Sequence, residues 1–158
     1  ARLGERVGSD VPYCVLGGTA LAEGRGEKLT PLPPLPFCHV VLCKPRFSIS
    51  TPELFALADR VRLRRRPDTA GLLSALEAGD LPGAARRMYN VFEDVLPSRQ
   101  RRVVEEIKGT LIASGALGAS MSGTGPTVFG LFDGQDAARA AWESLRENYR
   151  DTFLTTTV

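Results

Sequence analysis

Apolar residues recur every three or four positions across much of the second half of the chain, which is the spacing of amphipathic helices. The longest example contains Val103, Ile107 and Leu111, and Gly115 follows it as a typical helix end. Near residue 51, a serine and Pro52 precede another such run, as expected for the first turn of a helix. The pattern predicts a helix that begins at residue 51 and further helices over residues 69–78, 82–91, 98–114 and 136–149.

Short continuous apolar runs with β-branched members alternate with these helices and predict buried strands. The first of them, Cys38 to Cys43, contains two adjacent valines. A strand, several helices, two strands, a helix and a last strand describe an antiparallel sheet with helices on one face, so the predicted class is α+β. Strands are predicted over residues 38–43, 119–121, 127–132 and 153–158.

The beginning of the chain has a different pattern. Apolar, β-branched and aromatic residues fill Val11 to Leu16 and Gly18 to Ala22, and a glycine-rich turn and another short strand follow. This pattern predicts a hairpin or a meander. The segment Pro31 to Pro36 contains four prolines, which fit neither a helix nor a central strand. We therefore predict a linker there, between one unit of residues 1–36 and a second of residues 37–158.

The composition is that of an ordinary globular domain. The 158 residues are 43% hydrophobic, which is enough for one core, and the net charge is +2. This balance predicts no nucleic-acid partner, and the basic stretch Arg60 to Arg66 contains no aromatic residue for stacking. No apolar run reaches the roughly 20 residues that cross a bilayer, so no membrane association is predicted. With three cysteines beside apolar segments, one histidine and no Cys-x-x-Cys motif, we expect buried reduced thiols, no metal site and a cytoplasmic protein.

Two short motifs near the ends of the chain carry the candidate chemistry. Asp10, within Gly8 to Pro12, places a carboxylate on a predicted tight turn. Met121 to Pro126 forms a glycine-rich loop before an apolar run, where backbone N–H groups can approach phosphate oxygens closely. Each motif also has a purely structural interpretation, because Asp10 can cap a turn and the glycines can serve a strand connection. The chain contains no Gly-x-x-x-x-Gly-Lys-Ser/Thr phosphate loop.

Four stretches occur in order along the chain: Gly8-Ser9-Asp10-Val11-Pro12, Gly17-Gly18-Thr19-Ala20, Gly24 to Leu32, and Met121 to Phe132. Together they resemble the GHMP kinases, a family of ATP-dependent small-molecule kinases. The final loop recurs across that family, whereas the first three stretches resemble its branch that acts on 4-diphosphocytidyl-2-C-methyl-D-erythritol. The resemblance implies a ferredoxin-like GHMP kinase C-terminal domain in the second unit. The first unit would be a β-hairpin and catalytic turn that belong to an N-terminal domain of the ribosomal protein S5 domain 2-like fold.

The resemblance implies a reaction as well as a fold. The γ-phosphoryl group of ATP, with Mg²⁺, would pass to the 2-hydroxyl of 4-diphosphocytidyl-2-C-methyl-D-erythritol, a step of the non-mevalonate route to isoprenoid precursors. Asp10 would accept the hydroxyl proton or orient the hydroxyl, because phosphoryl transfer is mainly positioning and charge stabilisation. The residues that the resemblance places near the phosphates are Ser122, Gly123, Thr124 and Gly125.

Three further residues match positions that border the substrate in the family. Thr51 and Phe55 would face the substrate, with the aromatic ring stacked on cytosine. Arg25, between two glycines, would border the cytidine pocket. Thr51 and Phe55 also have plain structural uses, one near a helix cap and the other in a core.

The upstream half of such a kinase has no counterpart in this sequence. That half supplies a lysine beside the catalytic aspartate and the loop that cradles the ATP phosphates. We therefore expect the chain to be the C-terminal portion of a longer enzyme, to have the missing N-terminal half as its partner, and to be inactive alone. Two alternatives stay open: another GHMP kinase acting on mevalonate, homoserine or a sugar, and a non-catalytic α+β domain that binds a small ligand.

Overall fold

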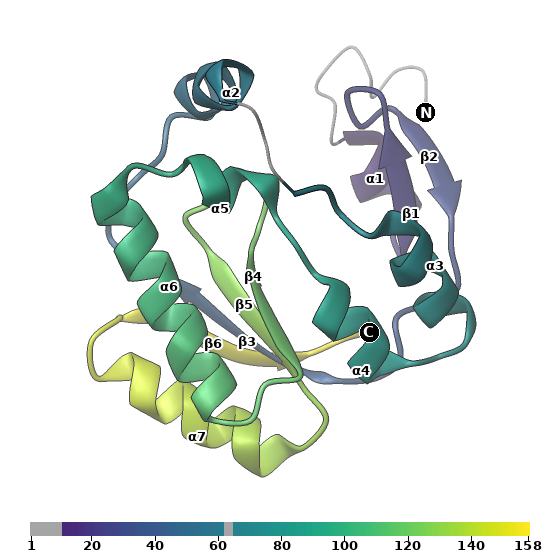
Figure 1. Cartoon of the computed structure of the whole chain (residues 1–158). Coiled ribbons are helices and arrows are strands. Elements are labelled where there is room, and N and C mark those ends of the chain that lie inside the picture. The colour runs from purple at the N-terminus through teal and green to yellow at the C-terminus, as the bar shows by residue number, and fades with distance from the viewer. Residues whose placement is uncertain (1–10, 62–64) are drawn as a thin grey trace.

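The computed structural model describes residues 11–61 and 65–158, and its centre is a four-stranded antiparallel sheet in the order β4-β5-β3-β6 (Figure 1). In the central strand β3, Val41 pairs with Gly130 of β5 on one side and with Leu154 of β6 on the other. Together with the helices, the order along the chain is β-α-β-β-α-β, which confirms the predicted ferredoxin-like α+β fold. The strands are β3 (His39–Lys44), β4 (Gly118–Met121), β5 (Val128–Phe132) and β6 (Asp151–Thr156).

Two amphipathic helices, α6 (Ser98–Ala113) and α7 (Gln135–Arg146), cover one face of this sheet. The periodicity of the sequence predicted both within a few residues at each end. Strand alternation sends Val128 and Phe132 of β5 to the same face. The main core lies between these layers, and its fully buried members include Val41, Ile107, Leu111, Val128, Phe132 and Ala141.

A third helix, α4 (Leu81–Arg87), packs on the opposite face of the sheet. There Leu81 and Ala85 lie with Cys38 and Leu131 in a second cluster of buried residues. The prediction of a sheet covered on one face only is therefore wrong. The close approach of α4 depends on Gly118 in β4, because a Cβ atom there would collide with the carbonyl oxygen of Ala85.

The beginning of the described chain contains the predicted hairpin, formed by β1 (Ala20–Glu23) and β2 (Lys28–Pro31). Figure 1 shows it beside α1 and α3, on the side of the molecule away from α6 and α7. The predicted strand over Val11–Leu16 is wrong, since these residues form the short helix α1. Pro12 favours the first turn of a helix, and the positive φ of Gly17 follows its end.

The remaining helices are short, namely α2 (Thr51–Arg60), α3 (Thr69–Glu77) and α5 (Val91–Val95). The helix predicted over residues 82–91 is too long, because α4 ends at Arg87 and the chain is extended at Asn90 before α5 begins. Of the basic stretch after α2, residues 62–64 lie outside the described part. No helix in the described residues is long and apolar enough to cross a membrane.

The three cysteines do not share one environment. Cys38 and Cys43 are fully buried, and burial raises the pKa of both thiols. Cys14 is exposed, so the prediction that all three are buried is wrong. The physical reason is that Cys14 lies on α1, much of whose apolar surface remains open, with Val15 77% exposed.

Candidate active site

The glycine-rich loop connects β4 to β5 and has a fixed backbone. The amide of Ser122 donates to the carbonyl of Thr127, and the amide of Gly125 donates to the carbonyl of Ser122, both at 2.8 Å. Gly123 and Gly125 have φ values of +53° and +83°, which favour glycine. A Cβ atom on Gly125 would also lie 2.5 Å from Met121 Sδ and 3.1 Å from Ile49 Cδ1. Both conformation and space therefore require glycine at residue 125.

Two amides of this loop are available to a ligand. Within residues 11–61 and 65–158, no group accepts a hydrogen bond from the backbone N–H of Gly123 or Thr124. Ser122 and Gly123 are exposed and Thr124 is half-buried. Consecutive free N–H groups in a glycine loop form a concave donor surface that suits an anion.

Asn90 holds this loop from the neighbouring chain segment. Its side-chain amide donates to the carbonyl of Met121 at 2.8 Å and to that of Gly123 at 2.7 Å. Its side-chain oxygen accepts from the amide of Phe92 at 2.9 Å and so caps α5. One side chain therefore ties the start of the loop to the start of a helix.

Glu93, one turn further along α5, anchors the end of β4. Its Oε1 atom accepts from the Met121 amide at 2.7 Å and from the Ser120 hydroxyl at 3.2 Å. Its Oε2 atom pairs with the ammonium group of Lys108 on α6. Because the Glu93 side chain is only 17% exposed, this charge needs the partner that Lys108 supplies.

The structure brings two of the predicted site residues into contact. The hydroxyl oxygens of Thr51, at the start of α2, and Thr124, in the glycine loop, lie 2.9 Å apart and share a hydrogen bond. Phe55 follows Thr51 by four positions on α2, so the two side chains lie on the same face of that helix. The α2 face that carries these residues therefore adjoins the glycine loop.

Phe55 is positioned by an aromatic neighbour and keeps much of its surface free. Its ring meets Phe92 edge to face, with ring centroids 4.9 Å apart and planes at 73°. The side chain is nevertheless 52% exposed, so it is not the core residue that one interpretation of the sequence offered. An exposed ring of fixed orientation can stack on a flat ligand.

The other two predicted residues are placed differently. Arg25 is exposed in the turn between β1 and β2, where its backbone amide donates to Glu27 Oε2 at 2.6 Å. Among the residues the structure describes, no hydrogen bond or ion pair joins Arg25 to Thr51, Phe55 or the loop. Asp10 lies outside the described residues, directly before α1 in the sequence.

Asn90, Phe92 and Glu93 are the members of this site that sequence reasoning missed. Asn90 fell inside a predicted helix, although an asparagine before an apolar residue is a common helix cap. Its contacts with Met121 and Gly123 span 31 and 33 residues, so no local pattern contains them.

Comparison with known proteins assigns the chain to one family. The model of the family described as "GHMP kinases C terminal" matches residues 72–151, and the chain belongs to the GHMP kinases. This is the class of protein that the ferredoxin-like sheet and its glycine loop define.

Two individual relatives within this family are more specific, because both bear the same enzyme name. The chain is 43% identical over 157 residues to the 4-diphosphocytidyl-2-C-methyl-D-erythritol kinase of Clostridium novyi (strain NT), covering 99% of this chain and 56% of the relative. It is 44% identical over 147 residues to the enzyme of the same name from Lachnospira eligens, covering 92% of this chain and 50% of the relative. The chain thus spans about half the length of the curated relatives it matches.

Solved structures of two kinases resemble the fold of this chain. A crystal structure of 4-(cytidine 5'-diphospho)-2C-methyl-D-erythritol kinase matches with a TM-score of 0.78 and 32% identity, covering 98% of this chain and 55% of that one. A crystal structure of L. major mevalonate kinase in complex with R-mevalonate matches with a TM-score of 0.73 at 21% identity, covering 94% of this chain and 51% of that one. The second likeness shows the shared fold alone.

Proposed function

We propose that the protein to which this chain belongs transfers the γ-phosphoryl group of ATP to the 2-hydroxyl of 4-diphosphocytidyl-2-C-methyl-D-erythritol, in the non-mevalonate route to isoprenoid precursors. The observation that carries the proposal is the contact between Thr51 and Thr124. It joins a helix face with an exposed aromatic ring to a loop with free backbone donors. Relatives at 43% and 44% identity bear the name of this enzyme.

The glycine loop forms the phosphate side of the proposed site. The amides of Gly123 and Thr124 would donate to phosphate oxygens, and the Ser122 hydroxyl adds a further donor. Fixed donors stabilise the charge that develops during phosphoryl transfer without having to reorganise. Gly125 keeps the loop in its conformation.

Mg²⁺ is proposed as a companion of ATP, and this part of the proposal rests on the family resemblance. In residues 11–61 and 65–158, no three His, Cys, Asp or Glu side chains are gathered to hold a metal. At kinase sites Mg²⁺ is bound through substrate phosphates plus one or two carboxylates, and no larger cage is needed. The ion neutralises phosphate charge when bound.

The α2 face forms the acceptor side. Phe55 would stack on the cytosine ring, because a flat aromatic surface offers dispersion contact with no hydrogen-bond demand. Thr51 would position the substrate beside the loop through its hydroxyl group. Arg25, in the hairpin turn, is proposed to border the cytidine pocket, and this role rests on the family resemblance alone.

Asp10 is proposed to act on the acceptor hydroxyl. A carboxylate within hydrogen-bond reach would accept the hydroxyl proton or orient the oxygen for in-line attack. This assignment rests on the motif Gly8 to Pro12.

The remaining parts of the proposal concern the whole enzyme. Residues 1–36 would belong with an N-terminal domain that binds ATP, and residues 37–158 would form the C-terminal domain. The 158 residues alone would not transfer phosphate, because the ATP-binding half contributes the other wall of the site. The soluble substrates, ATP and a nucleotide-linked polyol, are those of a cytoplasmic reaction.

A competition among acceptors tests the proposed function. The natural-length protein is incubated with ATP, Mg²⁺ and equal amounts of 4-diphosphocytidyl-2-C-methyl-D-erythritol, mevalonate and homoserine, and the products are separated by mass. We expect the cytidyl compound to be phosphorylated at least tenfold faster than the others. Faster transfer to mevalonate or homoserine would support the first alternative, and no transfer at all would support a non-catalytic domain.

Substitution of Phe55 tests the acceptor side separately. Stacking of a base on an aromatic side chain contributes about 1–3 kcal/mol, so Phe55→Leu should raise KM for the cytidyl substrate about tenfold. KM for ATP should stay unchanged. Phe153→Leu removes a ring of similar exposure, 57%, from β6 and serves as the matched control. An equal effect of both variants would argue against stacking at Phe55.

A further inference from the structure

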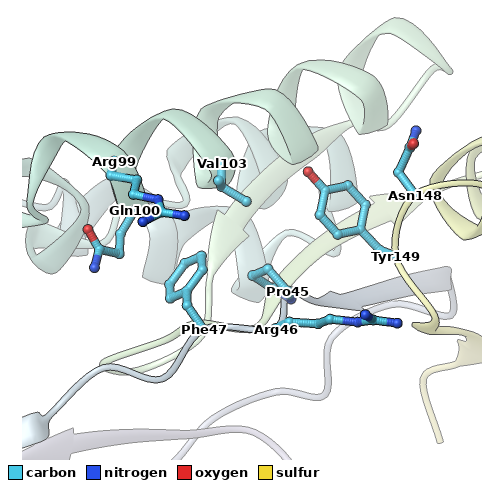
Figure 2. Close-up of a pocket in the computed structure, with 8 residues that line it drawn as sticks. All are labelled: Pro45, Arg46, Phe47, Arg99, Gln100, Val103, Asn148 and Tyr149. Atoms are coloured by element: carbon cyan, nitrogen blue, oxygen red, sulfur yellow. The ribbon is translucent and has the colours of Figure 1, made fainter.

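A pocket lies away from the glycine loop, on the side of the sheet that α6 covers. Its volume is about 450 Å³, and three separate segments enclose it: the residues after β3, the first turns of α6, and the connection from α7 to β6. Figure 2 shows α6 above the pocket and the segment after β3 below it. The lining residues are Pro45, Arg46, Phe47, Arg99, Gln100, Val103, Asn148 and Tyr149.

The floor and walls of this pocket are apolar and fixed. Pro45 is buried, and Phe47, Val103 and Tyr149 are half-buried side chains that pack against the main core. The Tyr149 hydroxyl donates to Glu106 Oε1 at 3.1 Å, which holds its ring in place. Two aromatic rings and a proline ring therefore offer a preformed surface to a flat molecule.

The lining residues include two arginines and no acidic residue, and among residues 11–61 and 65–158 the one carboxylate hydrogen-bonded to the lining is that of Glu106, which accepts from the Tyr149 hydroxyl. Arg46 and Arg99 are both exposed, and neither forms an ion pair among residues 11–61 and 65–158. In Figure 2, Arg99 and Gln100 descend from α6 near Phe47, and Arg46 extends towards the opposite end, where Tyr149 stands. Two guanidinium groups without acidic partners favour an oxyanion as ligand, because the planar fork of arginine matches carboxylate and phosphate oxygens.

We propose that this pocket binds a small organic anion, made of a flat apolar ring system and one phosphate or carboxylate group. The ring would lie against Phe47 and Tyr149, and the oxyanion would accept hydrogen bonds from Arg46 or Arg99. The volume falls within the range of about 300–1,000 Å³ typical of small-molecule sites. The site shares no residue with the glycine loop, and the proposal does not depend on the kinase function.

The pocket and the candidate active site are connected by one segment of the chain. The segment that supplies Pro45 and Phe47 continues to Ile49, which packs close to Gly125 of the glycine loop. A second hollow along this segment shares Pro45, Arg46 and Phe47 with the first pocket and is also lined by Ile49 and Pro126. A ligand in the first pocket would therefore rest on the same piece of chain that supports the loop.

Binding of simple probes tests the proposal directly. The probes are 1-naphthyl phosphate and 1-naphthoate, with 1-naphthol and inorganic phosphate as references that lack the charge or the ring. We expect at least one charged aromatic probe to bind with a Kd below about 1 mM and to shift the amide resonances of residues 46–47, 99–103 and 148–149. The stronger of the two probes identifies the oxyanion. Equal binding of 1-naphthol, or no shift at these residues, would overturn the proposal.

Charge removal completes the test. Either Arg46→Gln or Arg99→Gln should weaken the better probe about fivefold to tenfold, since charge-assisted hydrogen bonds from exposed groups are only partly screened, and the variant that does so identifies the arginine that holds the oxyanion. Arg86→Gln, at an exposed arginine on α4, keeps the net charge of these variants and should leave the Kd unchanged. Equal losses in all three variants would show a general charge effect and contradict the site. Binding to the 158-residue chain but not to the natural-length protein would also contradict it.

Discussion

Replacement of Asn90 by aspartate should loosen the glycine loop without removing a helix cap. The asparagine amide donates to the Met121 and Gly123 carbonyls at 2.8 and 2.7 Å, and its oxygen caps α5 by accepting from the Phe92 amide. Aspartate keeps the capping oxygen, because Asp and Asn are comparable caps. It has no N–H group, however, and turns a carboxylate towards two carbonyl oxygens.

The size of the effect follows from the two lost hydrogen bonds. Each contributes about 0.5–1.5 kcal/mol net, so the loop should lose about 1–3 kcal/mol against local opening. At about 1.4 kcal/mol per factor of ten, opening should become about 5-fold to 150-fold more frequent. Carbonyl solvation in the exposed part of the loop favours the lower end of this range.

Native-state hydrogen exchange measures this opening directly. The reporters are the amides of Ser122 and Gly125, which are hydrogen-bonded within the loop. We expect both to exchange at least fivefold faster in Asn90→Asp than in the parent chain. Asp80→Ala removes the cap of α4, a single hydrogen bond to Gly83, and should lower the free energy of unfolding without selectively exposing these two amides. Unchanged exchange of Ser122 and Gly125 in Asn90→Asp would refute the view that Asn90 holds the loop.

Three further predictions concern stability. Gly118→Ala should lower the free energy of unfolding by about 2–3 kcal/mol, because its Cβ atom would collide with the α4 backbone. Gly109→Ala, at a position with open space in α6, should raise the free energy of unfolding by about 0.5–1 kcal/mol. Urea unfolding measures both variants, and equal effects would contradict the packing of α4 against Gly118. Glu93→Gln should lower the free energy of unfolding by about 1–2 kcal/mol by breaking the anchoring ion pair, and an unchanged urea midpoint would contradict that anchor. Burial and the hydrogen bond to Glu106 raise the pKa of Tyr149 from 10.0 to about 12, so the folded state keeps this proton longer than the unfolded state and stability should fall as pH rises from about 10 to 12. The pKa of Tyr89 is also raised, by its hydrogen bond to Asp94, so the ultraviolet titration is compared between the parent chain and Glu106→Gln. One late transition should move to lower pH in the variant, and an unchanged titration would contradict the contact between Tyr149 and Glu106.

The sheet and its two covering helices are predictable from the sequence because local and tertiary preferences agree there. The apolar face of α6 is periodic, and the run at β3 is short and contains two adjacent valines, with Val41 and Cys43 buried. The hairpin is equally predictable, since Gly24 and Gly26 adopt the positive φ values that their turn requires.

The predictions from the sequence are wrong where two local signals conflict, or where a contact between residues distant in sequence determines the structure. Val11–Leu16 reads as a buried strand by composition, yet Pro12 near its start favours a helix and the observed α1 is largely exposed. The second layer, with α4 against the sheet, depends on the glycine at residue 118, whose reason is a backbone oxygen distant in sequence.

The candidate site also contains parts that the sequence predicts and a part that only the structure shows. The glycine loop and the Thr51 to Phe55 face are visible as motifs, because each lies within a few consecutive residues. The residue that ties the glycine loop to α5, Asn90, acts through carbonyl groups more than 30 residues away. Backbone carbonyls carry no sequence signal, so this contact could only come from the structure.

Phosphoryl transfer to one defined hydroxyl tests the central claim most directly. The natural-length protein is incubated with ATP, Mg²⁺ and 4-diphosphocytidyl-2-C-methyl-D-erythritol, and the product is followed by ³¹P nuclear magnetic resonance, with Asp10→Asn as the comparison. The account predicts a new phosphomonoester on the 2-hydroxyl, formed at least a hundredfold more slowly by Asp10→Asn, since general acid–base groups contribute about 10²–10⁴ in rate. Phosphorylation at another hydroxyl, or consumption of ATP with no phosphorylated product, would contradict it.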